Sequence, residues 1–350
     1  MGTRRAVLLV FSALMVALVC AGCGSDKHST STGTSDFVYL YDNSSYNATG
    51  SGAKAGRTHA HPSQSRTHHP TQLAASSASD IASGTVDLYY YDATTQTSTQ
   101  LNTASSYFCN VQLSNDGTKL LISAEDTETG DCQLYLADAK YQTINKLTTD
   151  ADDHYDASIS PDGTIIAYDD WDGDLYTLPA AGGTPTELTI TGVGGGYSPV
   201  FTPDNKHIVF EGCENACNIY IVSASGGAAT QLSQGTYWDG VPAVSPDGTK
   251  VVFDREAVSN GYTRDIAIIS INGESTSSPA TILSTDSSVS GGSWAPMFAG
   301  SGKLLFQSWK PNSDTSKNDN IFEINTDGTG LTRITNTLYE TCFNWAWWDD

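Results

Sequence analysis

Apolar residues occur along this chain in short runs that are separated by polar stretches rich in Gly, Ser, Thr and Asp. Runs such as "KLLIS", "IIAY", "HIVF", "KVVF" and "KLLF" are dominated by β-branched, aliphatic and aromatic residues, which favour strands. After the first twenty residues, no long stretch repeats apolar positions at helical spacing. The pattern therefore predicts an all-β protein.

The predicted strands belong to a repeated unit. Five segments align on a turn: "CNVQLSNDGTKLLIS" from Cys109, "YDASISPDGTIIAY" from Tyr155, "YSPVFTPDNKHIVF" from Tyr197, "GVPAVSPDGTKVVF" from Gly240 and "WAPMFAGSGKLLF" from Trp294. A polar loop, a third strand such as "NIYIVS" and a short last strand such as "ATQLS" follow in each unit. The turns at positions 116, 162, 204, 247 and 301 are 46, 42, 43 and 54 residues apart. This spacing is typical of four-stranded propeller blades.

The recurring Ser-Pro-Asp-Gly sequence has a structural explanation. Pro fixes the backbone that enters the turn, Asp accepts hydrogen bonds from the following backbone amides, and Gly tolerates positive φ. We therefore interpret Asp116, Asp162, Asp204 and Asp247 as turn residues and not as catalytic groups.

Incomplete units at the two ends of the chain complement each other. The C-terminal "ETCFNWAWWDD" matches the start of a unit, and "FVYLY", "VDLYYYD" and "TSTQLN" supply three further strands. Pairing these segments closes the ring and leaves no open sheet edge. The sequence thus predicts a six-bladed β-propeller over residues 36–350, whose sixth blade combines N-terminal strands with the C-terminal strand.

The first 22 residues have the features of an export signal. Arg4 and Arg5 precede a 14-residue apolar segment that is short for a bilayer span, and Ala21-Gly22 precedes Cys23. The Ala-Gly-Cys ending resembles the bacterial lipobox, although Cys20 stands where that family usually has Leu. We expect a lipoprotein signal peptide over 1–22, lipidation at Cys23 and a flexible tether over 23–35. Plain secretion and a retained anchor helix are the alternatives.

Two segments raise the question of a metal site. The stretch from about 43 to 84 has few large apolar groups and contains four histidines, but it lacks the carboxylate or Cys partners of a closed site, so we expect a disordered insertion. The "DDWDGD" segment at 169–174 carries four carboxylates but lacks the Gly and Glu positions of an EF-hand loop. We predict no metal site and no cofactor.

Net charge restricts the classes of partner. The chain has a formal charge of -22, and from residue 84 onward it contains 11 Lys and Arg against 35 Asp and Glu. Phosphate binding requires clustered Lys and Arg, so nucleic acid is not expected as a partner. Anionic lipid headgroups are disfavoured for the same reason, which leaves the lipid anchor as the expected membrane contact.

The units resemble the TolB-type propeller repeat, in which a Ser-Pro-Asp-Gly-Lys turn precedes an Ile-Ala-Phe-like strand and an Ile-Tyr strand. Pro203, Asp204, Lys206, residues 208–210 and Ile219-Tyr220 follow this pattern closely. The resemblance implies a propeller that serves as a docking platform, a gate on a hydrolase or a lyase scaffold. The chain has no Gly-x-Ser-x-Gly elbow of a hydrolase. Its repeats contain only His154 and His207, too few for the His cluster of the oligogalacturonate lyases.

Aromatic and acidic residues gather in the loops that start each blade. A propeller presents these loops on the same face as the loops between its second and third strands. We expect a ligand-binding channel mouth that includes Tyr155, Asp156, Tyr197, Tyr237, Trp238, Asp239 and Trp294. Such rings and carboxylates suit a sugar chain or a peptide with Lys or Arg. The alternative is that most of these rings pack between blades, and we assign no catalytic residue.

Five cysteines remain once Cys20 and Cys23 are set aside. In an exported chain they are disulfide candidates. Cys213 and Cys217 are close enough in sequence to close a small loop, and we favour that bond. Cys109 with Cys342 would join the two blades that meet on ring closure, whereas Cys109 with Cys132 is a competing pair within one blade.

These features favour a lipid-anchored bacterial envelope propeller, in the periplasm or on the cell surface, that acts as a non-enzymatic platform for a protein or peptide. Carbohydrate binding or polysaccharide cleavage is the alternative function, and a purely structural role is a third.

Overall fold

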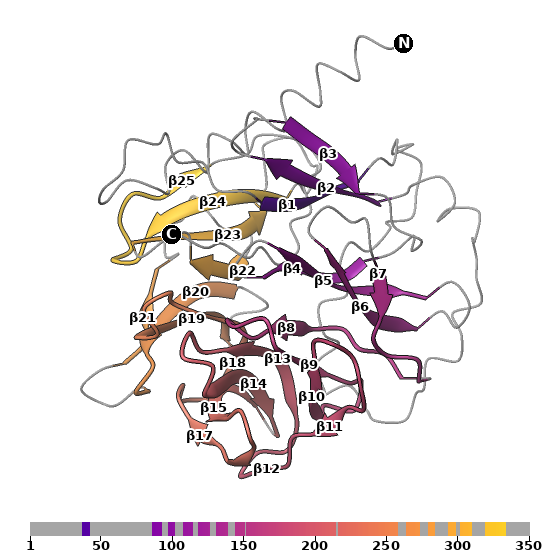
Figure 1. Ribbon diagram of the computed structural model, residues 1–350. Helices are drawn as coiled ribbons and strands as arrows, with labels where there is room; N and C mark the ends of the chain where they lie inside the picture. Colours follow the sequence, from indigo (N-terminus) through magenta and orange to yellow (C-terminus); the bar gives the residue numbers. More distant parts are fainter. Residues whose placement is uncertain are drawn as a thin grey trace, which may run out of the picture.

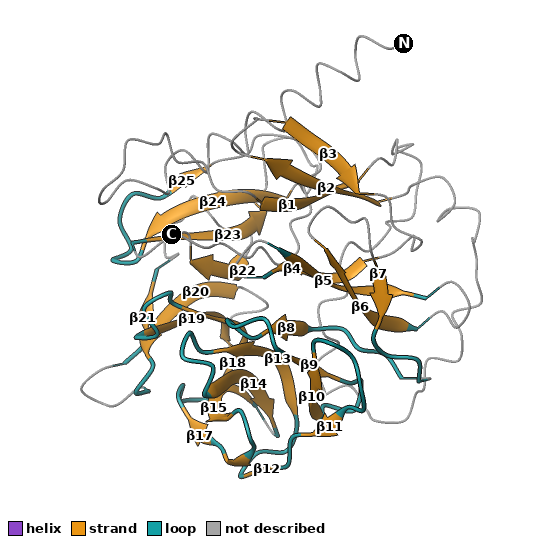
Figure 2. Ribbon diagram, viewed as in Figure 1, coloured by secondary structure: helices purple, strands orange, loops and turns teal. Residues whose placement is uncertain are grey.

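In the part of the chain that it describes, the computed structural model consists of strands, turns and loops, without a helix (Figures 1 and 2). The described residues are 37–42, 86–92, 97–101, 108–114, 118–126, 131–138, 144–150, 152–214, 216–257, 264–273, 279–283, 293–298, 302–309 and 319–333. Accordingly, none of these residues belongs to a helix that is long and apolar enough to span a bilayer.

Five four-stranded antiparallel sheets follow one another along the chain, and we number them blades 1 to 5. Blade 1 contains β4 (Phe108–Leu113), β5 (Lys119–Glu125), β6 (Cys132–Asp138) and β7 (Ile144–Lys146). Blade 2 contains β8 (Ala157–Ile159), β9 (Ile165–Asp169), β10 (Leu175–Pro179) and β11 (Thr186–Glu187). Blade 3 contains β13 (Gly196–Phe201), β14 (His207–Cys213), β15 (Cys217–Ser223) and β17 (Thr230–Gln231). Blade 4 contains β18 (Tyr237–Val244), β19 (Lys250–Ala257), β20 (Arg264–Ser270) and β21 (Thr281–Ile282), and blade 5 contains β22 (Ser293–Phe298), β23 (Lys303–Trp309), β24 (Asp319–Asn325) and β25 (Thr332–Arg333).

A three-stranded antiparallel sheet precedes blade 1 and contains β1 (Phe37–Asp42), β2 (Val86–Asp92) and β3 (Thr97–Leu101). A short parallel pair, β12 (Ile190–Thr191) with β16 (Gly227–Ala228), links the ends of blades 2 and 3. The predicted all-β propeller is confirmed. The three-stranded sheet contains the N-terminal strands that we assigned to a sixth blade, and β1 lies beside β4. Residues 334–350, 1–35 and 43–84 lie outside the described residues, so ring closure, lipidation at Cys23 and the insertion stay predictions.

The hydrophobic core is divided into layers between consecutive blades. Successive residues of a strand point to opposite faces, so the second strand of each of blades 2, 3 and 4 contributes to two layers. In β19, for example, Val251 and Phe253 pack with blade 3, whereas Val252 packs with blade 5. These side chains are fully buried. Because blades 2, 3 and 4 have such a layer on both faces, their central strands have continuous apolar runs.

The turns between first and second strands form as the sequence predicts. Asp162 Oδ1 accepts hydrogen bonds from Ser160 Oγ at 2.7 Å and from the Thr164 amide at 3.0 Å, and Gly163 has a φ of 68°. Asp247 and Asp204 make equivalent bonds in blades 4 and 3. These bonds lower the pKa of all three carboxyl groups, which are confirmed as turn residues. Asp116 lies outside the described residues.

Candidate functional site

The first strands of the five blades line a central cavity of about 110 Å³. The lining residues form two tiers, two positions apart in each blade-start segment, and in blades 2 to 5 the residue between the tiers also borders the cavity, namely Ala157, Pro199, Pro242 and Pro296. The first tier consists of Asn110, Asp156, Ser198, Val241 and Ala295, and the second tier consists of Gln112, Ser158, Val200, Ala243 and Met297. Blades 1 and 2 thus contribute only polar residues to the tiers, whereas blades 4 and 5 contribute only apolar ones.

Three first strands carry the same backbone irregularity at the first tier. Ser198, Val241 and Ala295 have φ values of 50°, 48° and 48°, and each stands before a Pro. The pairing with the second strand shifts register at each of these positions, as in a β-bulge. The left-handed conformation costs a non-glycine residue about 1–2 kcal/mol, and a β-branched residue more. Surrounding contacts must therefore stabilise this conformation.

Asp169, at the end of β9, supplies such a contact for Ser198. Its carboxylate is 1% exposed, and its two oxygens accept the backbone N–H groups of Asp156 and Ser198, both at 2.9 Å. Ser198 belongs to the next blade, so one carboxylate joins the first strands of blades 2 and 3. Asp156, which lies on the cavity wall, accepts bonds from Ser198 Oγ at 2.7 Å and from Asn110 Nδ2 at 3.3 Å.

An aromatic and acidic cluster lies in the loops before β8 and between β9 and β10. We call Asp153, Tyr155, Asp170 and Trp171 the aromatic–acidic corner. Trp171 is 47% exposed, and its ring centroid lies 5.7 Å from that of Tyr155. The Tyr155 hydroxyl donates to Asp153 Oδ2 at 2.8 Å, while Asp153 Oδ1 accepts the Cys132 amide at 2.7 Å. Burial raises the pKa of the Asp170 carboxyl.

Tyr197, at the start of β13, packs against the same loop. A Cβ on Gly173 would lie 2.6 Å from the Tyr197 hydroxyl oxygen, and Gly173 has a φ of 84°. Only glycine can therefore occupy position 173, because a side chain there would collide with Tyr197 and the backbone is in the left-handed region.

Blade 4 contains a buried charge network near the start of its first strand. Asp239 is fully buried and forms a two-point ion pair with Arg255, with both N–O distances at 2.7 Å. The Arg255 guanidinium lies over the Tyr237 ring, 4.6 Å from its centroid. Next to this pair, Arg264 binds Asp254 and Glu256 at 3.1 Å each. Burial raises the pKa of Asp254 to about 6, although Arg264 opposes the shift.

The TolB β-propeller domain model matches residues 79–298, well over half of the chain. The chain belongs to this family. No curated protein matches the chain in sequence.

Solved structures confirm the fold. A putative TolB from Agrobacterium tumefaciens has a TM-score of 0.56 and 23% identity, and the match covers 70% of this chain and 86% of the other. TolB from Acinetobacter baumannii has a TM-score of 0.54 and 18% identity, with 69% of this chain and 58% of the other covered. An oligogalacturonate lyase in complex with manganese has a TM-score of 0.52 and 19% identity over 70% and 71% of the two chains. At these identities the likeness concerns the fold alone.

In this TolB-type propeller, the predicted mouth residues whose side chains the structure describes lie in two groups, one at blades 2 and 3 and the other on blade 4. Tyr155, Asp156 and Tyr197 lie at blades 2 and 3, where Tyr155 meets Trp171 and Asp156 reaches the cavity. On blade 4, Arg255 connects Tyr237 with Asp239, and Trp238 is half-buried beside them in sequence. Trp294 pairs with Gln307 through the backbone at the start of blade 5, and its side chain lies outside the described residues.

Sequence reasoning did not single out several residues of this region. Asn110, Ser158 and Ser198 could have been found, because they align with Asp156 or lie two positions beyond it in the repeat. Trp171 lies within the acidic segment 169–174, which raised only the question of a metal site. The ion pairs of Arg255 and Arg264 gave no sequence signal, because pairing across strands depends on register.

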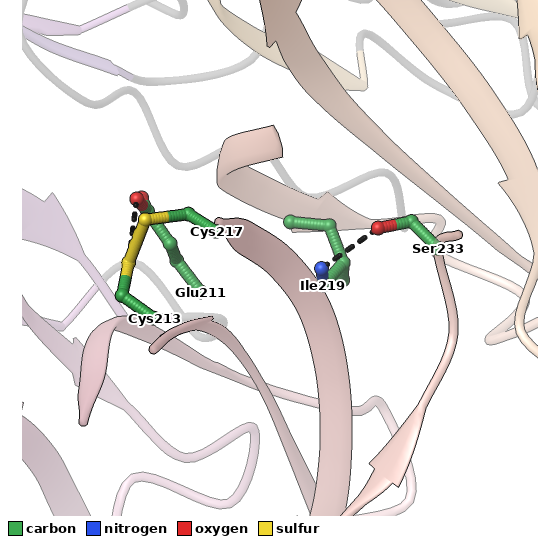
Figure 3. The surroundings of a disulfide bond; sticks show 5 residues. All are labelled: Glu211, Cys213, Cys217, Ile219 and Ser233. Atoms are coloured by element: carbon green, nitrogen blue, oxygen red, sulfur yellow. Dashed lines mark hydrogen bonds between the residues drawn. A yellow bond between two sulfur atoms is a disulfide. The ribbon is translucent and has the colours of Figure 1, made fainter. Parts of the chain in front are cut away.

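Cys213 and Cys217, at the ends of β14 and β15, are joined by a disulfide, as the sequence favoured (Figure 3). Glu211 Oε1 lies 3.5 Å from Cys213 Sγ. The potential ligand atoms of Glu211, Cys213 and Cys217 all lie within 4.8 Å of one another, as they would in a metal site. The oxidised sulfurs have no thiolate to offer a metal, so this cluster is a covalent link and not a ligand set. Cys132 is also disulfide-bonded, while the side chains of Cys109 and Cys342 lie outside the described residues.

Proposed function

We propose that this chain is a non-enzymatic propeller of the bacterial cell envelope that binds a protein or peptide at the mouth of its channel. The observation that carries the proposal is the aromatic–acidic corner of a TolB-family propeller. Trp171 exposes nearly half of its surface there, beside Tyr155 and several carboxylates. We include in the mouth Tyr197, at the start of blade 3, and Tyr237, at the start of blade 4, which is 39% exposed.

The chemistry of this corner favours a basic and partly apolar partner. An exposed indole offers both contact area and an electron-rich face for a cation. Asp153 holds the Tyr155 hydroxyl, so the ring is already positioned before a partner arrives. The strong negative charge of the chain would accelerate the encounter with a basic partner and make it sensitive to salt.

Location in the envelope is part of the proposal. The export signal and Cys23 support a lipid anchor, and the TolB relatives support an envelope protein. Globomycin treatment of cells that express the full chain tests the anchor, since a lipoprotein accumulates as its uncleaved precursor. Normal processing in the presence of the drug would contradict it.

Site-directed photocrosslinking in cells tests the docking surface. A photoreactive phenylalanine analogue replaces Trp171 in one strain and Ile165 in another. Ile165 is a suitable control because it is 40% exposed but lies at the opposite end of β9, beside the Ser-Pro-Asp-Gly turn. We expect a discrete protein adduct from position 171 and none from 165. Equal adducts from both positions, or none from either, would overturn the proposed surface.

Carbohydrate binding or cleavage is the second candidate, because an exposed Trp beside carboxylates also suits a sugar ring. The fold is shared with an oligogalacturonate lyase. Here, however, His154 is buried against Asp150 at the start of blade 2, whereas His207 lies next to the turn at the other end of blade 3. Incubation of the purified protein with envelope glycans and plant polysaccharides separates the candidates. Retention that depends on Trp171, or release of new reducing ends, would favour the carbohydrate function.

A further inference from the structure

Two buried polar atoms on the cavity wall have no hydrogen-bond partner among the described residues. They are Asn110 Oδ1 and Ser158 Oγ, in residues that are 2% and 3% exposed. Both residues line the central cavity, one in each tier. Buried polar groups are nearly always satisfied, so this pair indicates that a further donor completes the wall.

The orientation of the Asn110 amide follows from its neighbour. A carboxylate only accepts hydrogen bonds, so Asn110 must direct Nδ2 towards Asp156, which it does at 3.3 Å. Its Oδ1 is then left as an acceptor. The wall of blades 1 and 2 thus offers two neutral oxygen acceptors next to the carboxylate of Asp156.

The local charge is negative on this side of the cavity. Asp156 and Asp169 bind the same residue, Ser198, through its hydroxyl and its amide respectively. The described lining of the cavity contains no Lys, Arg or His. A cation with hydrogen-bond donors would therefore both neutralise the negative charge of this wall and supply donors to its two unpaired acceptors.

The opposite wall selects among cations. It is formed by Val241, Ala243, Ala295 and Met297, which offer no side-chain oxygen or nitrogen. A metal ion needs ligands on several sides, whereas an alkylammonium group has a polar tip and an apolar stem. The three N–H donors of an ammonium group match Asp156, Asn110 Oδ1 and Ser158 Oγ in number.

We propose that the central cavity receives the ammonium-tipped side chain of a Lys from the docked partner. The carboxylate of Asp156 supplies the opposite charge, Asn110 and Ser158 accept the remaining N–H groups, and the stem lies along blades 4 and 5. The inference rests on the proposed function, because the docked partner supplies the side chain. Its test uses a small probe and can fail while docking at Trp171 stands.

The experiment measures binding of n-butylammonium to the full propeller by saturation-transfer NMR and calorimetry. Neutral n-butanol, guanidinium and Ca²⁺ are the comparison probes. We expect n-butylammonium to bind more tightly than n-butanol, and D156N to weaken its binding about tenfold or more because a charged acceptor is lost. S158A should weaken n-butylammonium binding several-fold. This substitution breaks no hydrogen bond among the described residues, because the Ser158 hydroxyl has no partner there.

E187Q is the matched control, since Glu187 is an exposed acid on the outer strand of blade 2. It removes the same charge from the chain and should leave the affinity unchanged. If D156N does not fold, S158A decides the question alone. Equal binding of n-butanol, preferential binding of Ca²⁺ or guanidinium, or unchanged affinity in S158A would each overturn the proposal.

Discussion

Asp169 is expected to be one of the most sensitive polar positions of the propeller. Its carboxylate joins the first strands of two blades by accepting one backbone N–H from each, at Asp156 and at Ser198. The substitution Asp169→Asn keeps the shape of the side chain but replaces one accepting oxygen by an NH₂ group. One buried N–H then faces another donor.

The cost follows from the burial of this site. Asp169 is 1% exposed, so water cannot replace the lost acceptor. An unsatisfied buried donor costs about 1–3 kcal/mol, and the remaining bond loses its charge-assisted strength. Ser198 also keeps its left-handed φ of 50°, which the lost bond had helped to hold. Relief from burying a charge offsets part of this, and we expect a loss of about 3 kcal/mol in the free energy of unfolding.

Urea denaturation followed by Trp fluorescence measures this loss in the disulfide-intact protein. E187Q controls for the change in net charge, because Glu187 is exposed on an outer strand. We expect the midpoint to fall for D169N with an unchanged denaturant slope. A loss below about 1 kcal/mol would refute the reasoning, because it would mean that the two N–H groups find other acceptors or that the blades are not joined here.

Three further predictions concern single features. The raised pKa of Asp254, about 6, means that the folded state holds its proton where the unfolded chain has released it. The contribution of this carboxyl group to the free energy of unfolding is therefore fully present below about pH 4 and is lost as the pH rises through 6. Over that interval the stability of the wild type relative to D254N should fall by about 3 kcal/mol. A pH-independent difference between the two proteins in urea titrations would contradict this. Replacing Cys213 and Cys217 by Ala should cost about 2 kcal/mol, since the bond closes a loop with a sequence separation of 4, and an unchanged melting temperature would count against it. Asp247→Ala should cost about 1 kcal/mol through the lost turn bonds to Ser245 and Thr249, whereas Asp172→Ala, in an exposed loop, should be nearly neutral in the same assay.

Much of the fold could be predicted because the repeat is local. Each turn is made by bonds within five or six neighbouring residues, as between Asp162, Ser160 and Thr164. In a strand such as β19, the alternation of side chains between the two faces of the sheet is likewise a property of the backbone. The Cys213–Cys217 bond was accessible for the same reason, since it spans one hairpin.

The candidate site was less accessible from the sequence. Asp239 and Asp156 occupy neighbouring places in the blade-start segments, yet Asp239 is sealed in an ion pair with Arg255 while Asp156 borders the cavity. The sequence marks both as acids near a channel mouth. Their different roles depend on which residue of the second strand stands opposite, and on a one-residue bulge after Gly240.

Residue periodicity, neighbouring hydrogen bonds and total charge were enough to predict the all-β class, the blade repeat, the turn chemistry and the acidic character of the chain. Which polar residues meet could be read only from the folded chain. Asn110, Asp156, Ser158 and Ser198 come from three blades and meet at the cavity because the first strands converge there. That convergence arises from the packing of one blade on the next, and no single repeat contains it.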